Sequence, residues 1–288
     1  MFNTERFLQS LVLGCALALS ACQHPASTTS SVSTITVPEC SCIREAATGK
    51  ALPPAQLLAT LSKAPIVIVG EEHTNVQHHL IEQWLLQNLP KARSQGSVLM
   101  EMVDISQQAS VDRVKATMRS GSVVSESRVQ EAIRWNAGWP WPLYSDVVMT
   151  ALEGHYPLIA ANISRAQVNE LYNTPTFPAG AQSTNPQVHN ALSAIIYLMH
   201  DGKIEGEQLT AMMAIQQQRD RFMAEQLMKA PRPALLIAGG YHATKDIGVP
   251  LHLADLQADK PVVLMLTTKK TALTSKQADY IWSVPVEE

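Results

Sequence analysis

Short apolar runs alternate along this chain with longer segments in which apolar side chains recur every three or four positions. The runs are rich in β-branched residues and predict strands, whereas the longer segments predict amphipathic helices. The predicted strands are 66–69, 97–103, 156–161, 234–238, 262–266 and, at an edge, 280–284. The predicted helices are 55–63, 76–89, 105–120, 127–135, 144–153, 188–200 and 206–230. Pro90 is expected to end one helix, 171–186 to be a loop, and 39–54 a transitional segment.

Strands that alternate with helices predict an α/β fold with a mainly parallel sheet and helices on both faces. The last two helices form a hairpin at about 187–230, expected to pack across one end of the sheet as a helical subdomain. With 46% hydrophobic and 16% charged residues, the chain can bury a large core. The net charge of -3 provides no basic footprint, which excludes nucleic acid as an expected partner.

The N-terminus carries an apolar run that is too short to span a bilayer and ends in Leu-Ser-Ala-Cys22. This ending resembles the bacterial lipobox, although an ordinary cleaved signal peptide is the alternative. The resemblance implies a lipoprotein signal peptide at 1–21, a lipidated Cys22 with a flexible tether at 22–42, and a folded domain at 43–288. Gln23 resembles the residue after the cysteine in lipoproteins sent to the outer membrane, where the domain would face the periplasm. Cys40 and Cys42 are too close in sequence for an unstrained mutual disulfide, and redox or metal capture is the other possibility.

Two predicted strands are each followed by Gly-x-x-His, ending at His73 and at His242. Because the carboxyl ends of parallel strands meet at one edge of a sheet, we expect the two histidines to lie close together there. Gly70 is expected to let the backbone turn after its strand. Glu101 interrupts an apolar strand, so it is either a buried, partnered acid or the mark of a strand end.

A set of motifs in fixed order carries a family resemblance. They are Gly70-Glu-Glu-His-Thr-Asn-x-x-His-His79, Trp139-Pro-Trp-x-x-Tyr144, Ala160-Ala-Asn162, Gln218-Arg-Asp220, Gly239-Gly-Tyr-His242 and Asp246-Ile-Gly-Val-Pro250. Over about 66–253 the chain resembles the ChaN family of haem-binding lipoproteins, within a wider group that includes Tiki-type proteases, TraB proteins and erythromycin esterases. The resemblance implies haem binding, a role in bacterial haem-iron uptake with a haem receptor or transporter as a partner, and a homodimer enclosing two haems with tyrosine as iron ligand.

A ferric porphyrin needs an apolar slot and an axial ligand, for which tyrosinate and imidazole are suitable. The candidates for haem contact are Tyr144, Tyr197, His200, Met212 and Tyr241. Core packing is the alternative for Met212, and a helix-end role is the alternative for His200. The tryptophan-rich segment 135–141 forms either a partner surface or a loop pinned by core tryptophans.

Hydrolases of the wider group suggest a second hypothesis, a metal-dependent peptidase or esterase. Its catalytic residues would be Glu71, His73, Glu101, Arg219 and His242. His73, His242 and a carboxylate would provide three ligands for a divalent metal that activates water. The structural alternative is a polar network at the strand edge, with Arg219 paired to Asp220. His78 and His79 are either exposed or ligands.

Overall fold

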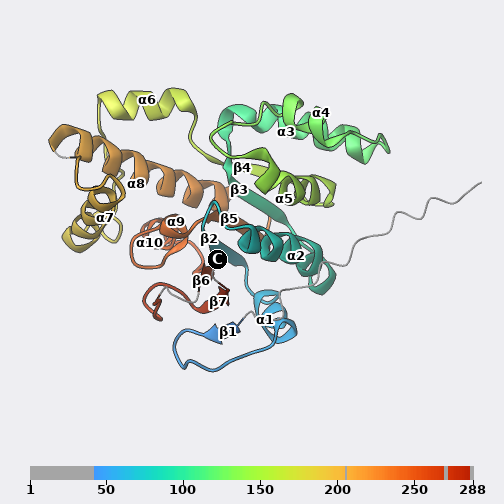
Figure 1. Cartoon of the computed structure of the whole chain (residues 1–288), viewed down its shortest axis with the longest axis horizontal. Coiled ribbons are helices and arrows are strands. Elements are labelled where there is room, and N and C mark those ends of the chain that lie inside the picture. The colour runs from blue at the N-terminus through green and yellow to red at the C-terminus, as the bar shows by residue number, and fades with distance from the viewer. Residues whose placement is uncertain (1–41, 205, 269–271, 286–288) are drawn as a thin grey trace, which may run out of the picture. The chain divides into compact units, whose positions relative to one another are not determined.

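The computed structural model describes residues 42–204, 206–268 and 272–285 (Figure 1). The strands are β1 (Cys42–Glu45), β2 (Ile66–Glu71), β3 (Ser97–Asp104), β4 (Leu158–Asn162), β5 (Ala234–Gly239), β6 (Val262–Thr268) and β7 (Tyr280–Val284). The helices are α1 (Pro54–Leu61), α2 (Val76–Ala92), α3 (Gln108–Arg119), α4 (Glu126–Ala132), α5 (Trp141–Glu153), α6 (Arg165–Asn173), α7 (Pro186–Met199), α8 (Gly206–Lys229), α9 (Gly240–Ala243) and α10 (Val249–Asp255), with a 3-10 turn η1 (Ile105–Gln107). The predicted signal peptide, Cys22, most of the tether and Cys40 lie outside these ranges.

The strands form one sheet in the order β1-β7-β6-β2-β5-β3-β4. Every neighbouring pair is parallel except β1 and β7, which confirms the prediction of a mainly parallel sheet. The prediction that 280–284 is an edge strand is wrong, because Cys42 pairs with Ser283 and β1 covers that edge. The segment predicted as transitional therefore contains the antiparallel edge strand.

Helices cover both faces of the sheet, as predicted. Val67 and Val69 of β2 belong to a core cluster shared with α2 and α5, while Ile66 and Ile68 belong to a second cluster shared with α8 and α10. Successive side chains of a strand point to opposite faces, so a central strand with two covered faces needs a continuous apolar run. Figure 1 shows α2 and α5 on one side of the strands and α8 and α10 on the other.

Some helix predictions need correction. α2 continues through exposed Pro90 to Ala92, and the Arg93 N–H still bonds to the Leu89 carbonyl at 2.9 Å, so the proline falls within the last turn without ending the helix. α6 enters the predicted loop, because Ser164 and Gln167 form a capping box that starts a helix there. The short helices α9 and α10 were not predicted.

The predicted helical hairpin is present as α7 and α8. The C-terminal half of α8 buries Met223, Ala224 and Leu227 in the second core cluster, so this helix also forms part of the layer that covers the sheet. Met212 packs, partly buried, on a small cluster formed where the two helices meet. None of the helices within the described ranges has the length and apolarity that a membrane span needs.

Candidate functional site

The carboxyl ends of three adjacent strands bring the predicted polar residues together. Glu71 ends β2 and pairs in register with Gly239, which ends β5, and β3 with Glu101 lies on the other side of β5. Gly70 lies within β2 and makes no turn, which corrects the prediction. A Cβ atom at Gly70 would lie 2.5 Å from the Met265 sulfur, so glycine permits the close approach of β6 and α9.

Glu101 connects the two Gly-x-x-His segments. It is buried, one oxygen accepts the Gly239 N–H at 2.8 Å, and the other lies 3.3 Å from His242 Nε2. His73 Nε2 lies 3.8 Å from the same carboxylate, which confirms that the two histidines meet at one strand edge. Glu101 is therefore the buried, partnered acid of the two alternatives. Gly239 leaves room for this arrangement, since its Cβ would lie 2.5 Å from His73 Nε2.

His242 has a second carboxylate partner, supplied by α8. Asp220 Oδ1 lies 2.6 Å from His242 Nδ1, and Gln216 one turn earlier lies 3.1 Å from the same nitrogen. The predicted pair of Arg219 with Asp220 is thus wrong, because consecutive helical residues point in different directions and Asp220 faces the sheet. α9 begins immediately after β5 and holds His242 over the strand edge.

Glu71 is the centre of a second network, which agrees with the alternative of a polar network at the strand edge. Tyr144 donates its hydroxyl hydrogen to Glu71 at 2.7 Å, and His73 Nδ1 lies 2.7 Å from the same oxygen. His79 Nε2 approaches the other oxygen at 3.3 Å. Both His78 and His79 are buried, which excludes the exposed alternative, and His78 Nδ1 accepts the Glu72 N–H at 2.9 Å.

These contacts determine the protonation states. Burial tends to raise the pKa of Glu71 and Glu101, but hydrogen bonds and charge attraction from His73, His79 and His242 prevail, so the pKa of Glu71 falls to about 2 and that of Glu101 falls further. Burial would lower the pKa of His242, yet Glu101 and Asp220 raise it to about 10, and that of His73 is also raised. His242 is therefore protonated at neutral pH and has no free lone pair to accept a proton or bind iron, and the carboxylates beside His73 favour its protonated form.

Glu82 on α2 is buried beneath the Glu71 network, and neither of its carboxyl oxygens has a hydrogen-bond partner. Burial, reinforced by the negative charge of Glu71, raises its pKa well above the ordinary value of 4.5. Because the folded state keeps Glu82 protonated while the unfolded state ionises, stability is fully present below pH 4.5 and is lost as the pH rises toward the folded-state pKa.

We therefore expect Glu82→Gln to raise the free energy of unfolding relative to the parent protein by more at pH 7 than at pH 4. Glutamine keeps the volume and removes the ionisation that favours the unfolded state. Denaturant unfolding at the two pH values measures the difference. Exposed Glu153 provides the control, and Glu153→Gln is expected to show no such pH dependence. Equal effects of Glu82→Gln at pH 4 and pH 7 would contradict the assignment of a protonated Glu82.

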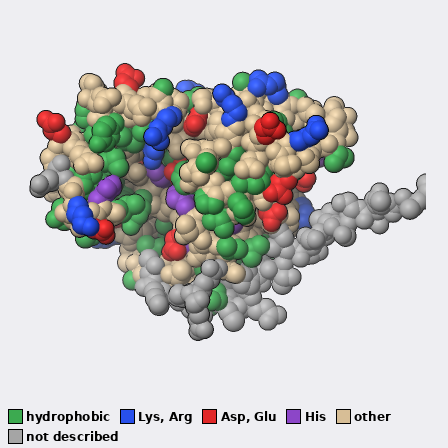
Figure 2. Space-filling model, turned by 45° about the horizontal axis from the view of Figure 1, so that its top comes forward, with side chains coloured by type: hydrophobic (Ala, Val, Ile, Leu, Met, Phe, Trp, Pro, Cys, Tyr) green, Lys and Arg blue, Asp and Glu red, His purple; other side chains and the backbone are tan. Residues whose placement is uncertain are grey.

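A cavity of about 820 Å³ opens beside the strand edge, within the range of sites that hold cofactors. The polar network forms one side, and α7 forms an apolar wall composed of Ala191, Leu192, Ile195, Ile196 and Met199. Trp139 closes another side and packs on His73 with ring centroids 4.6 Å apart. Figure 2 shows histidine side chains in a hollow bordered by hydrophobic side chains. A ligand with a large apolar part can therefore pack on the α7 wall while it lies beside the charged carboxylate–imidazole network.

The proposed haem-contacting residues lie at different depths. Tyr241 lines the cavity and is 49% exposed. Tyr144 is fully buried and does not line the cavity, and Tyr197, although 44% exposed, does not line it either. His200 bonds through Nδ1 to the Ile196 carbonyl at 2.8 Å. Met212 is also absent from the cavity lining.

Sequence inspection missed the α7 wall and the role of Trp139. The wall side chains recur at helical spacing along α7, a pattern that core packing would equally explain. Trp141 is buried and Trp135 and Trp139 are half-buried against the main core cluster, which supports the loop pinned by tryptophans rather than a free partner surface.

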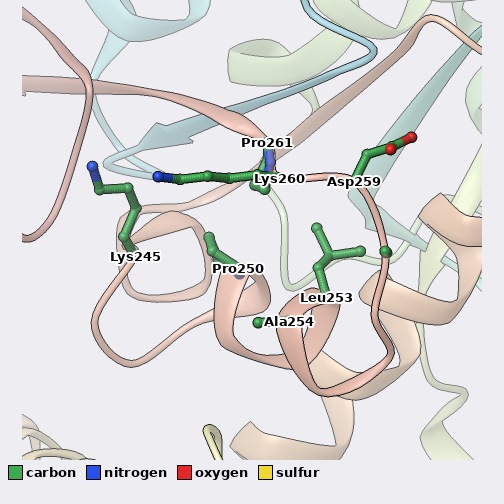
Figure 3. Close-up of a pocket in the computed structure, with 8 residues that line it drawn as sticks. Lys245, Pro250, Leu253, Ala254, Asp259, Lys260 and Pro261 are labelled. Carbon is green, nitrogen blue, oxygen red and sulfur yellow. The ribbon is translucent and has the colours of Figure 1, made fainter.

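Two other features concern the metal hypothesis and a second cavity. Within the described ranges, no group of three or more His, Cys, Asp and Glu side chains has metal-binding geometry, so His73 and His242 gain no support as metal ligands. A second cavity of about 360 Å³ lies near the start of β6 (Figure 3). Its lining includes Lys245, whose ammonium group is paired with Asp279 at 2.7 Å.

Comparison with known proteins identifies the family. A family model described as haem-binding uptake, Tiki superfamily, ChaN matches residues 57–253, which include both polar networks and most of the residues that line the cavity. The chain belongs to this family. Among solved structures, this ChaN-family chain is similar to ChaN of Campylobacter jejuni, a protein described as binding haem cofacially, with 28% sequence identity, a TM-score of 0.78, and coverage of 84% of this chain and 96% of that one.

More distant structures resemble the ChaN-family chain weakly. The type III effector HopBA1 has 13% identity and a TM-score of 0.47 over 80% of this chain and 92% of its own. The erythromycin esterase EreC has 12% identity and a TM-score of 0.46 over 83% of this chain and 81% of its own. No curated protein matches the sequence.

Proposed function

We propose that this protein binds haem in the cavity beside the strand edge and takes part in haem-iron uptake without a catalytic step of its own. Membership of the haem-binding uptake family supports the ligand. The observation that supports the location is a cavity of about 820 Å³ that is lined both by the apolar wall of α7 and by a half-exposed tyrosine, Tyr241.

Tyr241 is our proposed axial ligand. It is the one tyrosine among the residues that line the cavity in the described part of the chain. A tyrosinate oxygen is a hard anionic donor that suits ferric iron. His73 also lines the cavity, but its Nδ1 atom lies 2.7 Å from Glu71 and its Nε2 atom 3.8 Å from Glu101, and these carboxylates raise its pKa, which favours the protonated form that cannot bind iron. Tyr144 donates its hydroxyl hydrogen to Glu71, and burial followed by the Glu71 charge raises its pKa strongly, which opposes tyrosinate formation.

We further propose that two copies close over haem. Leu198 and Met199 at the end of α7 are 73% and 63% exposed, and Met199 also lines the cavity. Large apolar side chains exposed beside an opening favour burial against a second surface. The described cofacial haem binding of Campylobacter jejuni ChaN is consistent with such a pair.

Titration of the described domain with haemin tests this function. We expect a saturable Soret shift at micromolar haemin, with bands typical of tyrosinate-bound ferric haem. Sedimentation of the saturated sample should then show a species of twice the monomer mass. Absence of a saturable shift would overturn the proposal of haem binding. A shift without a change in mass would contradict only the proposed dimer.

The N-terminal sequence supports a proposal for the cellular location. We propose that Cys22 is lipidated and holds the domain on the periplasmic face of the outer membrane, because the preceding Leu-Ser-Ala resembles a lipobox and several acyl chains on one residue give lasting anchoring. Metabolic labelling of the full-length chain with palmitate, compared with Cys22→Ser, tests the anchor. Retention of label by Cys22→Ser would contradict it. A haem receptor or transporter in the same membrane is the partner that this location suggests.

A further inference from the structure

Arg219 is the only arginine or lysine among the residues that line the large cavity in the part of the chain that the structure describes. It lies on α8, three residues after Gln216, which contacts His242. Its guanidinium group takes no part in the proposed iron ligation or in the carboxylate–imidazole networks described above.

The guanidinium group has no recorded protein partner. Within the described ranges Arg219 forms no ion pair, and its Nε atom is buried without a hydrogen-bond acceptor. Arg221, two residues further along α8, shows the usual arrangement: its guanidinium donates to the Ala179 carbonyl and lies 3.7 Å from Asp255. A buried donor without an acceptor costs free energy, so the Nε atom of Arg219 would gain from an acceptor that a ligand supplies.

The neighbouring carboxylates do not fill this role. Arg219 lowers the pKa of Asp220 through its charge, but burial is the larger influence and raises that pKa to about 6. Asp220 Oδ1 contacts His242, and Glu101 contacts both His242 and Gly239. The charge of Arg219 thus favours the ionised form of Asp220 without a hydrogen bond between the two side chains. The N–H groups of Arg219 stay available to a ligand.

A guanidinium group presents a planar fork of N–H donors that matches the two oxygens of a carboxylate. The α7 wall of the same cavity is apolar and suits an apolar body. The structure assigns to this cavity a ligand with a large apolar body and a carboxylate at its edge, and we propose that Arg219 binds that carboxylate. On the proposed function above, which this inference presupposes, the carboxylate is a porphyrin propionate.

The test compares haemin with haemin dimethyl ester, in which both propionates are blocked. We expect the parent protein to bind haemin about tenfold to a hundredfold more tightly than the ester, the range for a charge-assisted hydrogen-bonded pair. Arg219→Gln should bind both forms with similar affinity, because the anion-specific contact is gone. Arg219→Lys, which keeps the charge but not the fork, should show an intermediate preference. Exposed Arg128 on α4 gives the control with the same change in charge, and Arg128→Gln should keep the full preference.

The outcomes separate the two claims. If the parent protein binds neither form, the proposed function fails and this inference fails with it. If the parent protein binds haemin but discriminates against the ester no better than Arg219→Gln does, the proposed contact between Arg219 and a propionate is overturned, while haem binding itself stands. Should Arg219→Gln not fold, the comparison of the parent with Arg219→Lys decides, and an unchanged preference in the lysine variant would overturn the proposed fork contact.

Discussion

Glu101→Ala is expected to lower the free energy of unfolding by about 3–5 kcal/mol, the usual cost of removing one partner from a buried ion pair. The substitution leaves the Gly239 N–H without its acceptor at 2.8 Å and removes the nearest carboxylate from His242 Nε2. Both groups are buried, so the loss of their carboxylate partner leaves a buried N–H donor and a buried imidazolium less well compensated. Chemical denaturation monitored by circular dichroism measures the effect.

The pH dependence of this effect has a defined sign. The pKa of His242 is raised from 6.5 to about 10, so its stabilisation is complete below pH 6.5 and is lost as the pH rises through 10. The pKa of Glu101 is lowered from 4.5, so its stabilisation is complete above pH 4.5 and is lost as the pH falls toward the folded-state value. The difference between parent and Glu101→Ala should therefore be largest between pH 4.5 and 6.5 and decrease toward pH 10.

Two variants control this prediction. Glu101→Gln keeps an oxygen for the Gly239 N–H but loses the charge, so we expect a smaller loss of about 1–3 kcal/mol. Exposed Glu153 makes no recorded contact in the described part of the chain, and Glu153→Ala should change stability by no more than about 0.5 kcal/mol. An effect of Glu101→Ala as small as that of Glu153→Ala would show that the network does not stabilise the fold.

Tyr241→Phe is expected to remove the charge-transfer bands of ferric tyrosinate haem and to weaken haemin binding at least about tenfold, or roughly 1.4 kcal/mol. Phenylalanine keeps the ring against the cavity but cannot supply an oxygen to iron. Absorption and electron paramagnetic resonance spectra of the haemin-loaded variant report the ligand directly, and a Soret titration reports the affinity.

Tyr197 is the matched control, because its exposure of 44% is close to the 49% of Tyr241 and it does not line the cavity. Tyr197→Phe should keep both the bands and the affinity. Tyr144→Phe should keep the bands as well, while its loss of the hydrogen bond to Glu71 lowers stability by about 1–3 kcal/mol. Loss of the tyrosinate bands in either control, together with their retention in Tyr241→Phe, would contradict our assignment.

The strands and the main site motif could be predicted because they depend on local pattern. Central strands such as β2 are covered on both faces, so their residues are continuously apolar and stand out in the sequence. Parallel pairing then requires the segments after β2 and β5 to meet at one edge, so the sequence predicts that His73 and His242 lie close together, and both do lie against Glu101. The edge strand β1 was missed, because it is short and its apolar side chains do not alternate regularly.

By itself, the sequence determined the fold class, the family resemblance and the meeting of the two Gly-x-x-His segments. Only the tertiary structure decided what each polar residue contacts. Tyr144 and Tyr241 are the same residue type, and the sequence offers no way to tell their roles apart. In the structure Tyr144 is buried on α5 and donates to Glu71, whereas Tyr241 directly after β5 lines the cavity. Contacts between distant segments depend on how helices pack on the sheet, and that packing leaves no local pattern in the chain.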